Sequence, residues 1–207
     1  ASPMPQPLLE RLIALYPKLD LYQGYGMTEA SAVLTVLRPD DHRKGGALLR
    51  SAGRPVPGVT LRIEDEDGKV LPNHQTGEVC ARAGNFMLEY WKKPEATTEA
   101  FRDGWYHTGD AGYLDDQGYL YLVDRVKDMI VTGGENVYSI EVENAVASHP
   151  AVAQVAVIGI PHASWGEAVH AIVVVHAGKT VTEAEIIEHA RQLIAGFKLP
   201  KSVEFRT

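Results

Sequence analysis

Cysteine is almost missing from this sequence, which carries only Cys80, so a disulfide within the chain is excluded. Chains without disulfides are typical of a reducing compartment, and we expect a cytoplasmic protein with Cys80 as a buried strand thiol. Long apolar runs are lacking too: none approaches the ~18 residues of a membrane-spanning helix, and the first residues do not resemble a signal peptide. The sequence thus predicts no transmembrane segment and no secretion.

An excess of positive charge is also absent. The 20 Lys and Arg residues are outnumbered by 27 Asp and Glu residues, and the formal net charge is −7. Because a nucleic-acid binder needs a basic surface, nucleic acid is not an expected partner. The histidines lack the spacing of zinc motifs, so no histidine metal site is expected. What the chain does have is 45% hydrophobic residues, enough for a sizeable core.

Turn signals divide residues 51–123 into short segments with strand composition. Glycine follows an acidic or amide residue at Asp67-Gly68, Asp103-Gly104 and Gln117-Gly118. Such pairs favour β-hairpins, so we predict a small antiparallel β-barrel or sheet. Before it, we predict an amphipathic helix near the start of the chain, and then a short strand and a glycine turn within residues 18–37.

After Asp124 the pattern changes to an alternation of strands and helices. Strands are predicted within 128–133, 152–161 and 168–178, and helices within 139–150 and 181–194. Thr182 is the expected N-cap of the second helix, with Glu185 in the capping-box position. The buried stripe of this helix should comprise Ile186, Ile187, Ala190 and Leu193. Two helices on a three-stranded sheet make a compact α+β domain.

Four polar or glycine-rich motifs follow one another along the chain: GYGMTE (24–29), GWYHTGD (104–110), DRVKD (124–128) and VTGGENVY (131–138). Taken singly, they could be a turn, a hairpin loop, a solvated linker and a flexible bend. Together, with flanking stretches such as GEVCARAG and FKLPKSVEF, they resemble the adenylate-forming superfamily and, within it, the fatty-acyl-CoA synthetases. The resemblance covers nearly the whole chain.

The resemblance implies an ATP-dependent acid–thiol ligase that works in two steps. A carboxylic acid, here a fatty acid, reacts with ATP to give an acyl-adenylate and pyrophosphate, and coenzyme A then displaces AMP. A carboxylate is a poor electrophile, and joining it to AMP provides a leaving group. ATP/AMP, Mg²⁺ and coenzyme A are therefore the implied ligands, and lipid metabolism is the implied context.

The residues that match the nucleotide site of the superfamily are Gly24, Tyr25, Gly26, Thr28, Asp110, Leu122 and Arg125. The GYG stretch would form the adenine site, where missing side chains admit the base and Tyr25 offers an aromatic face. Thr28 matches a hydroxyl that contacts the α-phosphate, and Glu29 matches the catalytic carboxylate that holds Mg²⁺. A helix N-cap is the alternative for both residues.

Two further residues of this nucleotide site have alternatives as well. Asp110 matches the ribose-binding aspartate of the superfamily, with a turn-stabilising aspartate as the alternative. Leu122 matches an apolar residue near the base, but a core position is equally consistent with its type.

Lys127 matches the hinge about which the C-terminal domain of the superfamily rotates between the two steps. Gly133, Gly134 and Glu135 match the loop that this rotation brings to coenzyme A. A strand-to-loop bend would explain the two glycines equally well.

The implied fold class is an α/β and α+β mix. It comprises the end of a large N-terminal AMP-binding domain with a small antiparallel β-barrel at 1–124, and a small, mobile α+β C-terminal domain at 125–207. The hinge falls at 124–127.

Two features of the superfamily are not found in these 207 residues. Its phosphate-binding loop precedes the first motif, and its catalytic lysine follows the stretch that matches PKSVEF. The full-length enzyme is expected to be active and the 207 residues by themselves inactive. Milder departures are Ser139 after Tyr138, and Glu89-Tyr90-Trp91 in place of Gly-Tyr-Trp.

Two other functions stay open. An adenylation domain could load a carrier protein instead of coenzyme A, and a non-catalytic nucleotide-binding module could carry the same motifs. The identity of the acid and the oligomeric state, a homodimer included, stay open as well.

Overall fold

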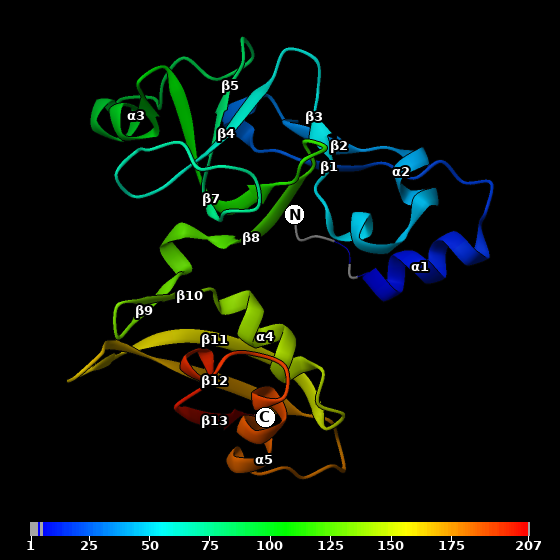
Figure 1. The fold of residues 1–207 in the computed structure, drawn as a ribbon, viewed down its shortest axis with the longest axis vertical. Helices are drawn as coiled ribbons and strands as arrows, with labels where there is room; N and C mark the ends of the chain where they lie inside the picture. The colour runs from blue at the N-terminus through cyan, green and yellow to red at the C-terminus, as the bar shows by residue number, and fades with distance from the viewer. Residues whose placement is uncertain (1–3, 5, 207) are drawn as a thin grey trace. The chain divides into compact units, whose positions relative to one another are not determined.

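The chain folds into two compact units, residues 1–122 and 123–207, in the computed structural model of Figure 1. The structure describes residue 4 and residues 6–206. Both units combine helices with sheets, so the predicted mixture of α and β structure is confirmed. The domain boundary at residue 124 and the hinge at 124–127 stay predictions. In the part of the chain that is described, no helix combines the length and apolarity needed to cross a bilayer.

The first half of unit 1 holds the predicted N-terminal helix and an antiparallel sheet in the order β1-β2-β3. Its elements are α1 (Gln6–Leu15), β1 (Gln23–Tyr25), η1 (Thr28–Ala30), β2 (Thr35–Leu37), α2 (Pro39–Lys44), η2 (Gly46–Arg50) and β3 (Arg54–Pro55). The short strand predicted within residues 18–37 is present as β1, although it begins only at Gln23. Of the two glycines of the GYG stretch, Gly24 lies on β1 opposite Val36, and only Gly26 lies in the connection between β1 and β2.

The second half of unit 1 is a curled five-stranded sheet built from hairpins, which confirms the predicted β region (Figure 1). Its elements are β4 (Thr60–Glu64), β5 (Gly77–Arg82), α3 (Pro94–Ala100), β6 (Phe101–Arg102), β7 (Trp105–Leu114) and β8 (Leu120–Arg125), whose last three residues belong to unit 2. Strands β4, β5, β7 and β6 pair in that order, and β8 pairs with β7.

The glycine turns of this sheet lie largely where the sequence predicts them. Gly104 (φ 77°) and Gly118 (φ 76°) each lie between two paired strands, in a backbone conformation that favours glycine. Asp67-Gly68 instead turns the chain between β4 and an isolated bridge at Val70. Two of the three predicted hairpins therefore join neighbouring strands of the sheet directly.

Two small apolar clusters fill unit 1. One comprises Ala52, Ile63, Val79 and Leu120, and the other comprises Ala30, Leu34 and Ala81. Tyr25 packs against both clusters, so the first motif is anchored in the core of unit 1.

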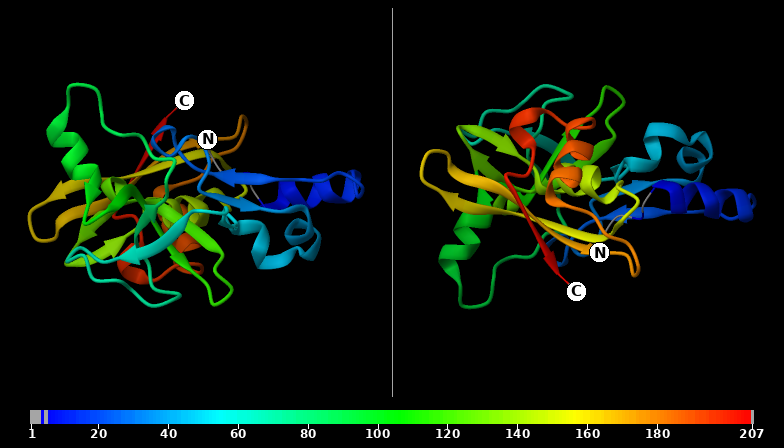
Figure 2. Two further views of the ribbon diagram at one scale, coloured as in Figure 1. Left: turned by 90° about the horizontal axis from the view of Figure 1, so that it is seen from above. Right: turned by 90° about the horizontal axis from the view of Figure 1, so that it is seen from below.

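Unit 2 is built on a sheet in the order β10-β9-β12-β11, with β13 parallel to β12. Its elements are η3 (Val126–Asp128), β9 (Ile130–Thr132), β10 (Glu135–Val137), α4 (Ser139–Ala147), β11 (Val152–His162), β12 (Gly166–Val175), α5 (Glu183–Arg191), η4 (Gly196–Lys198) and β13 (Ser202–Arg206). Figure 2 shows β11 and β12 running side by side as one long hairpin.

The prediction of only three strands in unit 2 was wrong, because β10 and β13 were missed. β10 is three residues long, too short for a periodic pattern. β13, with the sequence SVEFR, carries charges at two of its five positions and is largely exposed. Short strands and exposed strands bury little apolar surface, so their sequences show little sign of a strand.

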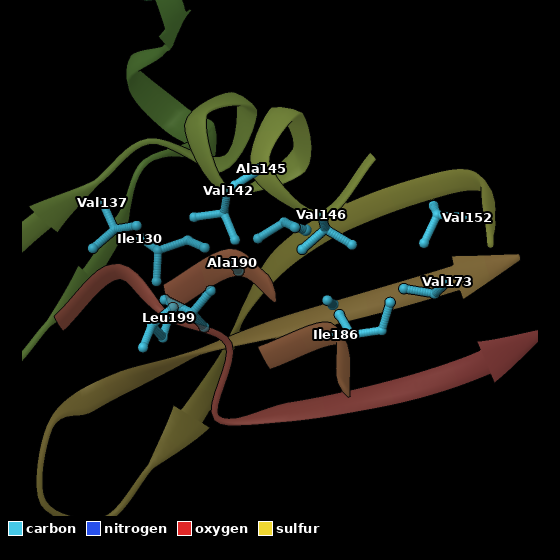
Figure 3. Packing of buried hydrophobic residues seen from close by; sticks show 13 residues of the cluster. Ile130, Val137, Val142, Ala145, Val146, Val152, Val173, Ile186, Ala190 and Leu199 are labelled. Carbon is cyan, nitrogen blue, oxygen red and sulfur yellow. The ribbon is translucent and has the colours of Figure 1, made fainter. Parts of the chain in front are cut away.

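Both helices of unit 2 contribute to one apolar core (Figure 3). Val142 and Val146 of α4 and Ile186 and Ala190 of α5 are fully buried. The predicted stripe on α5 is thus correct at Ile186 and Ala190, and Ile187 is half-buried. It was wrong at Leu193, which is 56% exposed because the helix ends two residues earlier.

The predicted capping box of α5 is confirmed. Thr182 Oγ1 accepts from Glu185 N at 3.3 Å, and Glu185 Oε2 accepts from Thr182 N at 2.8 Å. The two residues thereby satisfy two backbone donors at the start of the helix.

Glu143 on α4 is expected to reduce the stability of unit 2 at neutral pH. Burial raises the pKa of its carboxyl group above the usual 4.5, and the charges of Asp124 and Asp128 raise it further. An acid whose pKa is raised by folding contributes stability below its unfolded pKa, and this contribution is lost as the pH rises through the folded value.

Glu143→Gln keeps an oxygen for the Val157 N–H, which donates to Glu143 Oε1 at 2.9 Å. We expect it to raise the free energy of unfolding at pH 7 by roughly 0.5 kcal/mol, with a smaller gain near pH 4. Urea unfolding at the two pH values measures this, with the exposed Glu188→Gln as the control. A variant that is less stable than wild type at pH 7 would contradict the expectation.

Candidate functional site

The first motif places Thr28 and Glu29 on η1. Met27 occupies the N-cap position of this short helix, and no side chain caps it. The helix-cap alternative for Thr28 and Glu29 was therefore wrong. Thr28 is exposed and Glu29 is half-buried, so the hydroxyl and the carboxylate are both accessible to a ligand.

The two glycines of GYG differ in what the chain requires of them. A Cβ on Gly26 would lie 1.9 Å from the Ala32 carbonyl oxygen, so packing within the chain itself demands glycine there. A Cβ on Gly24 would be 3.8 Å from its nearest neighbour, the Thr35 carbonyl oxygen, which is an ordinary contact. Ala32 adopts a left-handed conformation (φ 87°) that non-glycine residues rarely take, a strain frequent at binding sites.

The first and second motifs meet where Tyr25 OH donates to Asp110 Oδ2 at 2.7 Å. Burial, followed by the charge of Asp110, raises the pKa of Tyr25, so its hydroxyl stays a donor at neutral pH. The ring of Tyr25 is therefore fixed at one end by the core and at the other by a carboxylate.

Asp110 lies within the long strand β7 rather than in a turn, so the hairpin-loop and turn-aspartate alternatives were wrong. The pairing of β5 with β7 shifts register here, and Gly109 takes a positive φ of 70°. Thr108 Oγ1 donates to the Val79 carbonyl at 2.8 Å and accepts from Asp110 N at 3.1 Å. The HTGD motif thus forms an irregular stretch of β7 that the hydrogen bonds of Thr108 hold in place. Asp110 at its end accepts from Tyr25.

Glu29 has a partner that the sequence motifs did not predict. Tyr90 OH donates to Glu29 Oε1 at 2.8 Å, and the hydroxyl of Tyr106 lies 3.4 Å from that of Tyr90. Burial raises the pKa of Tyr106, and the charges of Glu29 and Asp110 raise it further. The two predicted carboxylates therefore act on the same tyrosine.

The segment that carries Tyr90 is fastened to η1. Ser31 Oγ donates to the Asn85 carbonyl at 2.7 Å, and Asn85 Nδ2 donates to the Ala30 carbonyl at 2.7 Å. Met87 N donates to the Glu29 carbonyl at 2.7 Å. Because these contacts join residues more than fifty positions apart, the only sign of them in the sequence is the match of Tyr90 to a superfamily tyrosine.

A pocket of about 460 Å³ opens beside these tyrosines. It is lined by Glu78, Tyr90, Lys93, Ala96, Glu99, Ala100, Arg102, Tyr106, His107, Thr108 and Gly109. The lining contains two acidic residues, Glu78 and Glu99, and two basic residues, Lys93 and Arg102. The charge of the pocket therefore favours neither an anion nor a cation. Sequence reasoning did not predict this pocket, because its wall combines β5, β6, β7, α3 and the loop before α3.

The remaining predicted nucleotide residues are less enclosed. Leu122 is half-buried and packs against the core of unit 1, which agrees with the core alternative. Arg125 is the exposed last residue of β8. Lys127 is exposed, as predicted, but it lies in the 3₁₀ turn η3 rather than in an extended linker. Roles for these three residues stay predictions.

The first residue of the DRVKD motif, Asp124, stabilises helix α4 of unit 2. Asp124 Oδ2 accepts from Ser139 Oγ at 2.8 Å and from Ile140 N at 3.2 Å, so a residue before η3 caps the N-terminus of α4. A carboxylate at this end of a helix satisfies a free N–H group and complements the helix dipole.

Asp124→Ala is expected to lower the free energy of unfolding of unit 2 by about 1 kcal/mol, the usual loss when a side chain that accepts from the first N–H groups of a helix is removed. Denaturant unfolding followed by circular dichroism measures this. Asp128→Ala is the control, because it removes a neighbouring carboxylate for which no hydrogen bond to α4 is found in the described part of the chain. Equal losses in the two variants would contradict the capping role.

Gly133 and Gly134 form the two-residue turn between β9 and β10. Thr132 pairs with Glu135 across this turn, and both glycines have positive φ values, 62° and 84°. A two-residue hairpin of this kind requires two residues that tolerate positive φ. The alternative explanation, a bend at the end of a strand, was correct in giving the glycines a backbone role. The structure has a two-residue hairpin turn at this point.

Three potential metal ligands meet on neighbouring strands of unit 1. Glu64, Cys80 and His107 are largely buried, and ligand atoms of all three lie within 4.8 Å of one another. Spacing along the chain cannot reveal this group, because each residue comes from a different strand. Burial, followed by the charges of Glu64 and Glu78, raises the pKa of Cys80, so the thiol stays protonated. The predicted buried thiol is confirmed.

Two arginine side chains form ion pairs or hydrogen bonds with residues in and beside this cluster. Arg62 pairs with Glu64, while Arg102 Nη2 lies 3.1 Å from Glu78 Oε2 and 2.6 Å from His107 Nδ1. Two carboxylates are thus matched by two cations. A protonated thiol and two guanidinium groups disfavour a metal ion, and we assign the cluster to the internal ion-pair network of the sheet.

Comparison with known proteins agrees with these features. The model of the AMP-binding enzyme family matches residues 1–91, and the model of the AMP-binding enzyme C-terminal domain matches residues 141–207. The fatty acid–[acyl-carrier-protein] ligase ScoC of Streptomyces coeruleorubidus is 43% identical over 204 residues, 99% of this chain and 39% of that protein. The long-chain-fatty-acid–CoA ligase FadD13 of Mycobacterium tuberculosis is 44% identical over 202 residues, 96% of this chain and 39% of that protein.

Solved structures show the same likeness. O-succinylbenzoate CoA synthetase MenE of Bacillus subtilis, in complex with an acyl-adenylate intermediate, has a TM-score of 0.88 and 36% identity over 100% of this chain and 41% of its own. ATP-bound MatB of Rhodopseudomonas palustris has a TM-score of 0.82 and 39% identity over 90% of this chain and 36% of its own.

The chain belongs to the adenylate-forming superfamily of AMP-binding ligases, and it corresponds to the C-terminal portion of these enzymes. It spans about two fifths of the length of the curated relatives it matches.

Proposed function

We propose that this chain is part of an ATP-dependent ligase that converts a fatty acid to its acyl-adenylate and transfers the acyl group to coenzyme A. One observation carries the proposal. Tyr25 binds Asp110 and Tyr90 binds Glu29, and the charges of both carboxylates act on Tyr106. The residues that match a ribose ligand and a magnesium ligand are therefore neighbours within unit 1.

The nucleotide half of the site has the groups that adenylation needs. A carboxylate offers about four lone-pair sites, so Asp110 can accept from Tyr25 and from ribose hydroxyls at the same time. Thr28 has an exposed hydroxyl that can donate to a phosphate oxygen. Tyr25 is held in one orientation and can present its ring to the base.

Glu29 fits a magnesium ion. Its Oε1 accepts from Tyr90, and for Oε2 no bond is found among the residues that the structure describes. Mg²⁺ prefers hard oxygen ligands and is commonly held by one or two carboxylates together with substrate phosphates. When bound, the ion supplies positive charge to phosphate oxygens during the transfer.

The surface around the Gly133-Gly134 turn supports coenzyme A as the acceptor. Gly133 N donates to the Trp165 carbonyl at 2.9 Å, and the indole of Trp165 is stacked on His162 with ring centroids 4.2 Å apart. Lys201 Nζ lies 5.4 Å from the centre of the same indole. An exposed aromatic face next to a cation suits an adenine ring and its phosphates.

A carrier protein is the second candidate acceptor. It is favoured by the relative ScoC, which carries the name of a fatty acid–[acyl-carrier-protein] ligase and is 43% identical to this chain. The aromatic and cationic surface around Trp165 makes free coenzyme A our first choice.

The test uses the complete gene product. Fatty acids of increasing length, ferulate and succinylbenzoate are compared in ATP–pyrophosphate exchange, followed by thioester formation with coenzyme A or holo-acyl carrier protein. We expect exchange with a fatty acid and thioester with coenzyme A, and no exchange by the 207 residues alone. No exchange by the complete protein with any acid would overturn the proposal and favour a non-catalytic nucleotide-binding module.

A further inference from the structure

Tyr90 contacts the predicted magnesium ligand but belongs to none of the four motifs. Its hydroxyl reaches Glu29 Oε1 across 61 positions of sequence, at 2.8 Å. The next hydroxyl, that of Tyr106, is buried and lies 3.4 Å further on. Glu29, Tyr90 and Tyr106 thus form a chain of neighbouring oxygen atoms that connects η1 with a buried residue of β7.

The backbone of Tyr90 is fixed independently of its side chain. Tyr90 N donates to Thr97 Oγ1 at 3.0 Å, and Lys93 N donates to the Tyr90 carbonyl at 3.0 Å. Thr97 Oγ1 in turn donates to the Lys93 carbonyl at 2.9 Å. Both polar backbone groups of Tyr90 are therefore bonded, one by Thr97 of α3 and the other by the N-cap residue of this helix, Lys93.

The hydroxyl of Tyr90 is the donor in this contact. A carboxylate oxygen accepts hydrogen bonds, and the phenol supplies the hydrogen that lies between Tyr90 and Glu29 Oε1. The bond therefore fixes the position of one of the two carboxylate oxygens.

We infer that Tyr90 is a positioning residue for the magnesium ligand: it holds Glu29 Oε1, so that Oε2 of the same carboxylate is directed to the ion. This inference rests on the proposed function. Groups that orient a metal ligand usually change metal affinity about 10–100-fold when they are removed. Tyr90 would therefore set the affinity for Mg²⁺ through its hydrogen bond to Glu29.

The test varies free Mg²⁺ in the pyrophosphate-exchange reaction of the complete enzyme, with ATP and acid saturating. Tyr90→Phe removes one oxygen and should raise the Mg²⁺ concentration for half-maximal rate about 10-fold, with kcat at saturating Mg²⁺ within about twofold of wild type. Thr97→Val releases the backbone of Tyr90 and should shift the Mg²⁺ dependence in the same direction by a smaller factor. Tyr113→Phe is the matched control, because this tyrosine of β7 stacks on Tyr121.

A second measurement separates positioning from damage to the fold. Binding of Mn²⁺ in the presence of ATP, followed by electron paramagnetic resonance, should weaken by the same factor in Tyr90→Phe, while the melting temperature stays that of wild type. An unchanged Mg²⁺ dependence, tighter binding of the ion, or a loss of kcat alone would overturn the inference and leave the proposed function intact. A wild-type enzyme without Mg²⁺-dependent exchange would overturn both.

Discussion

Lys127→Pro is expected to slow thioester formation far more than adenylation in the complete enzyme. Proline fixes φ near −65° and removes a backbone donor, so rotation about this residue is restricted. Lys127 lies in the first turn of η3, where proline is tolerated, so the variant should fold. If Lys127 is the hinge, unit 2 would stay near one orientation. The Gly133-Gly134 turn could then no longer be presented to the adenylate.

Two separate assays measure this effect. Pyrophosphate exchange reports adenylation, and transfer to coenzyme A from preformed acyl-adenylate reports the second step. Lys127→Ala is the matched control, since it removes the same side chain but leaves φ free. We expect the ratio of the two rates to change at least about 100-fold in the proline variant and only a few-fold in the alanine variant. Equal losses in both steps, or no loss, would make Lys127 an ordinary turn residue.

Glu29→Gln is expected to reduce the rate of adenylation at least about 100-fold. Glutamine has the same shape and can still accept from Tyr90, so the chain of neighbouring oxygen atoms should survive. The charge that would hold Mg²⁺ is lost, however, and the phosphate oxygens would no longer be neutralised.

The exposed Glu66→Gln, in the turn after β4, is the matched control because it also removes one negative charge from unit 1. Pyrophosphate exchange as a function of Mg²⁺ measures the loss, and a high concentration of Mg²⁺ should restore part of the rate. Activity of Glu29→Gln equal to that of the control would show that this carboxylate does not bind the ion.

Local chemistry in the sequence predicted much of the fold. The turns at Gly104 and Gly118 and the cap at Thr182 depend on residues a few positions apart, so their patterns are visible in the chain itself. The strand β13 was missed because an exposed strand needs no apolar alternation. Leu193 was misplaced because α5 already ends at Arg191, and the apolar period of a helix does not mark its last residue.

The Gly133-Gly134 pair is consistent with two explanations, a hairpin turn and a loop that binds coenzyme A. The hairpin requires positive φ at both positions, so the glycines would be needed there without any ligand. The exposed Trp165 beside Gly133 is what favours a binding role, and it lies in another part of the sequence.

By itself, the sequence determined the class of protein, because four short motifs follow one another along the chain in the order typical of the superfamily. The roles that these motifs suggest for Thr28, Glu29 and Asp110 stay predictions. Only the tertiary structure decided which groups support them. Tyr90 reaches Glu29, and Asp124 caps α4, through contacts between segments that are distant in sequence. A hydrogen bond of this kind needs one donor and one acceptor at about 3 Å, and it imposes no periodicity on the residues between them.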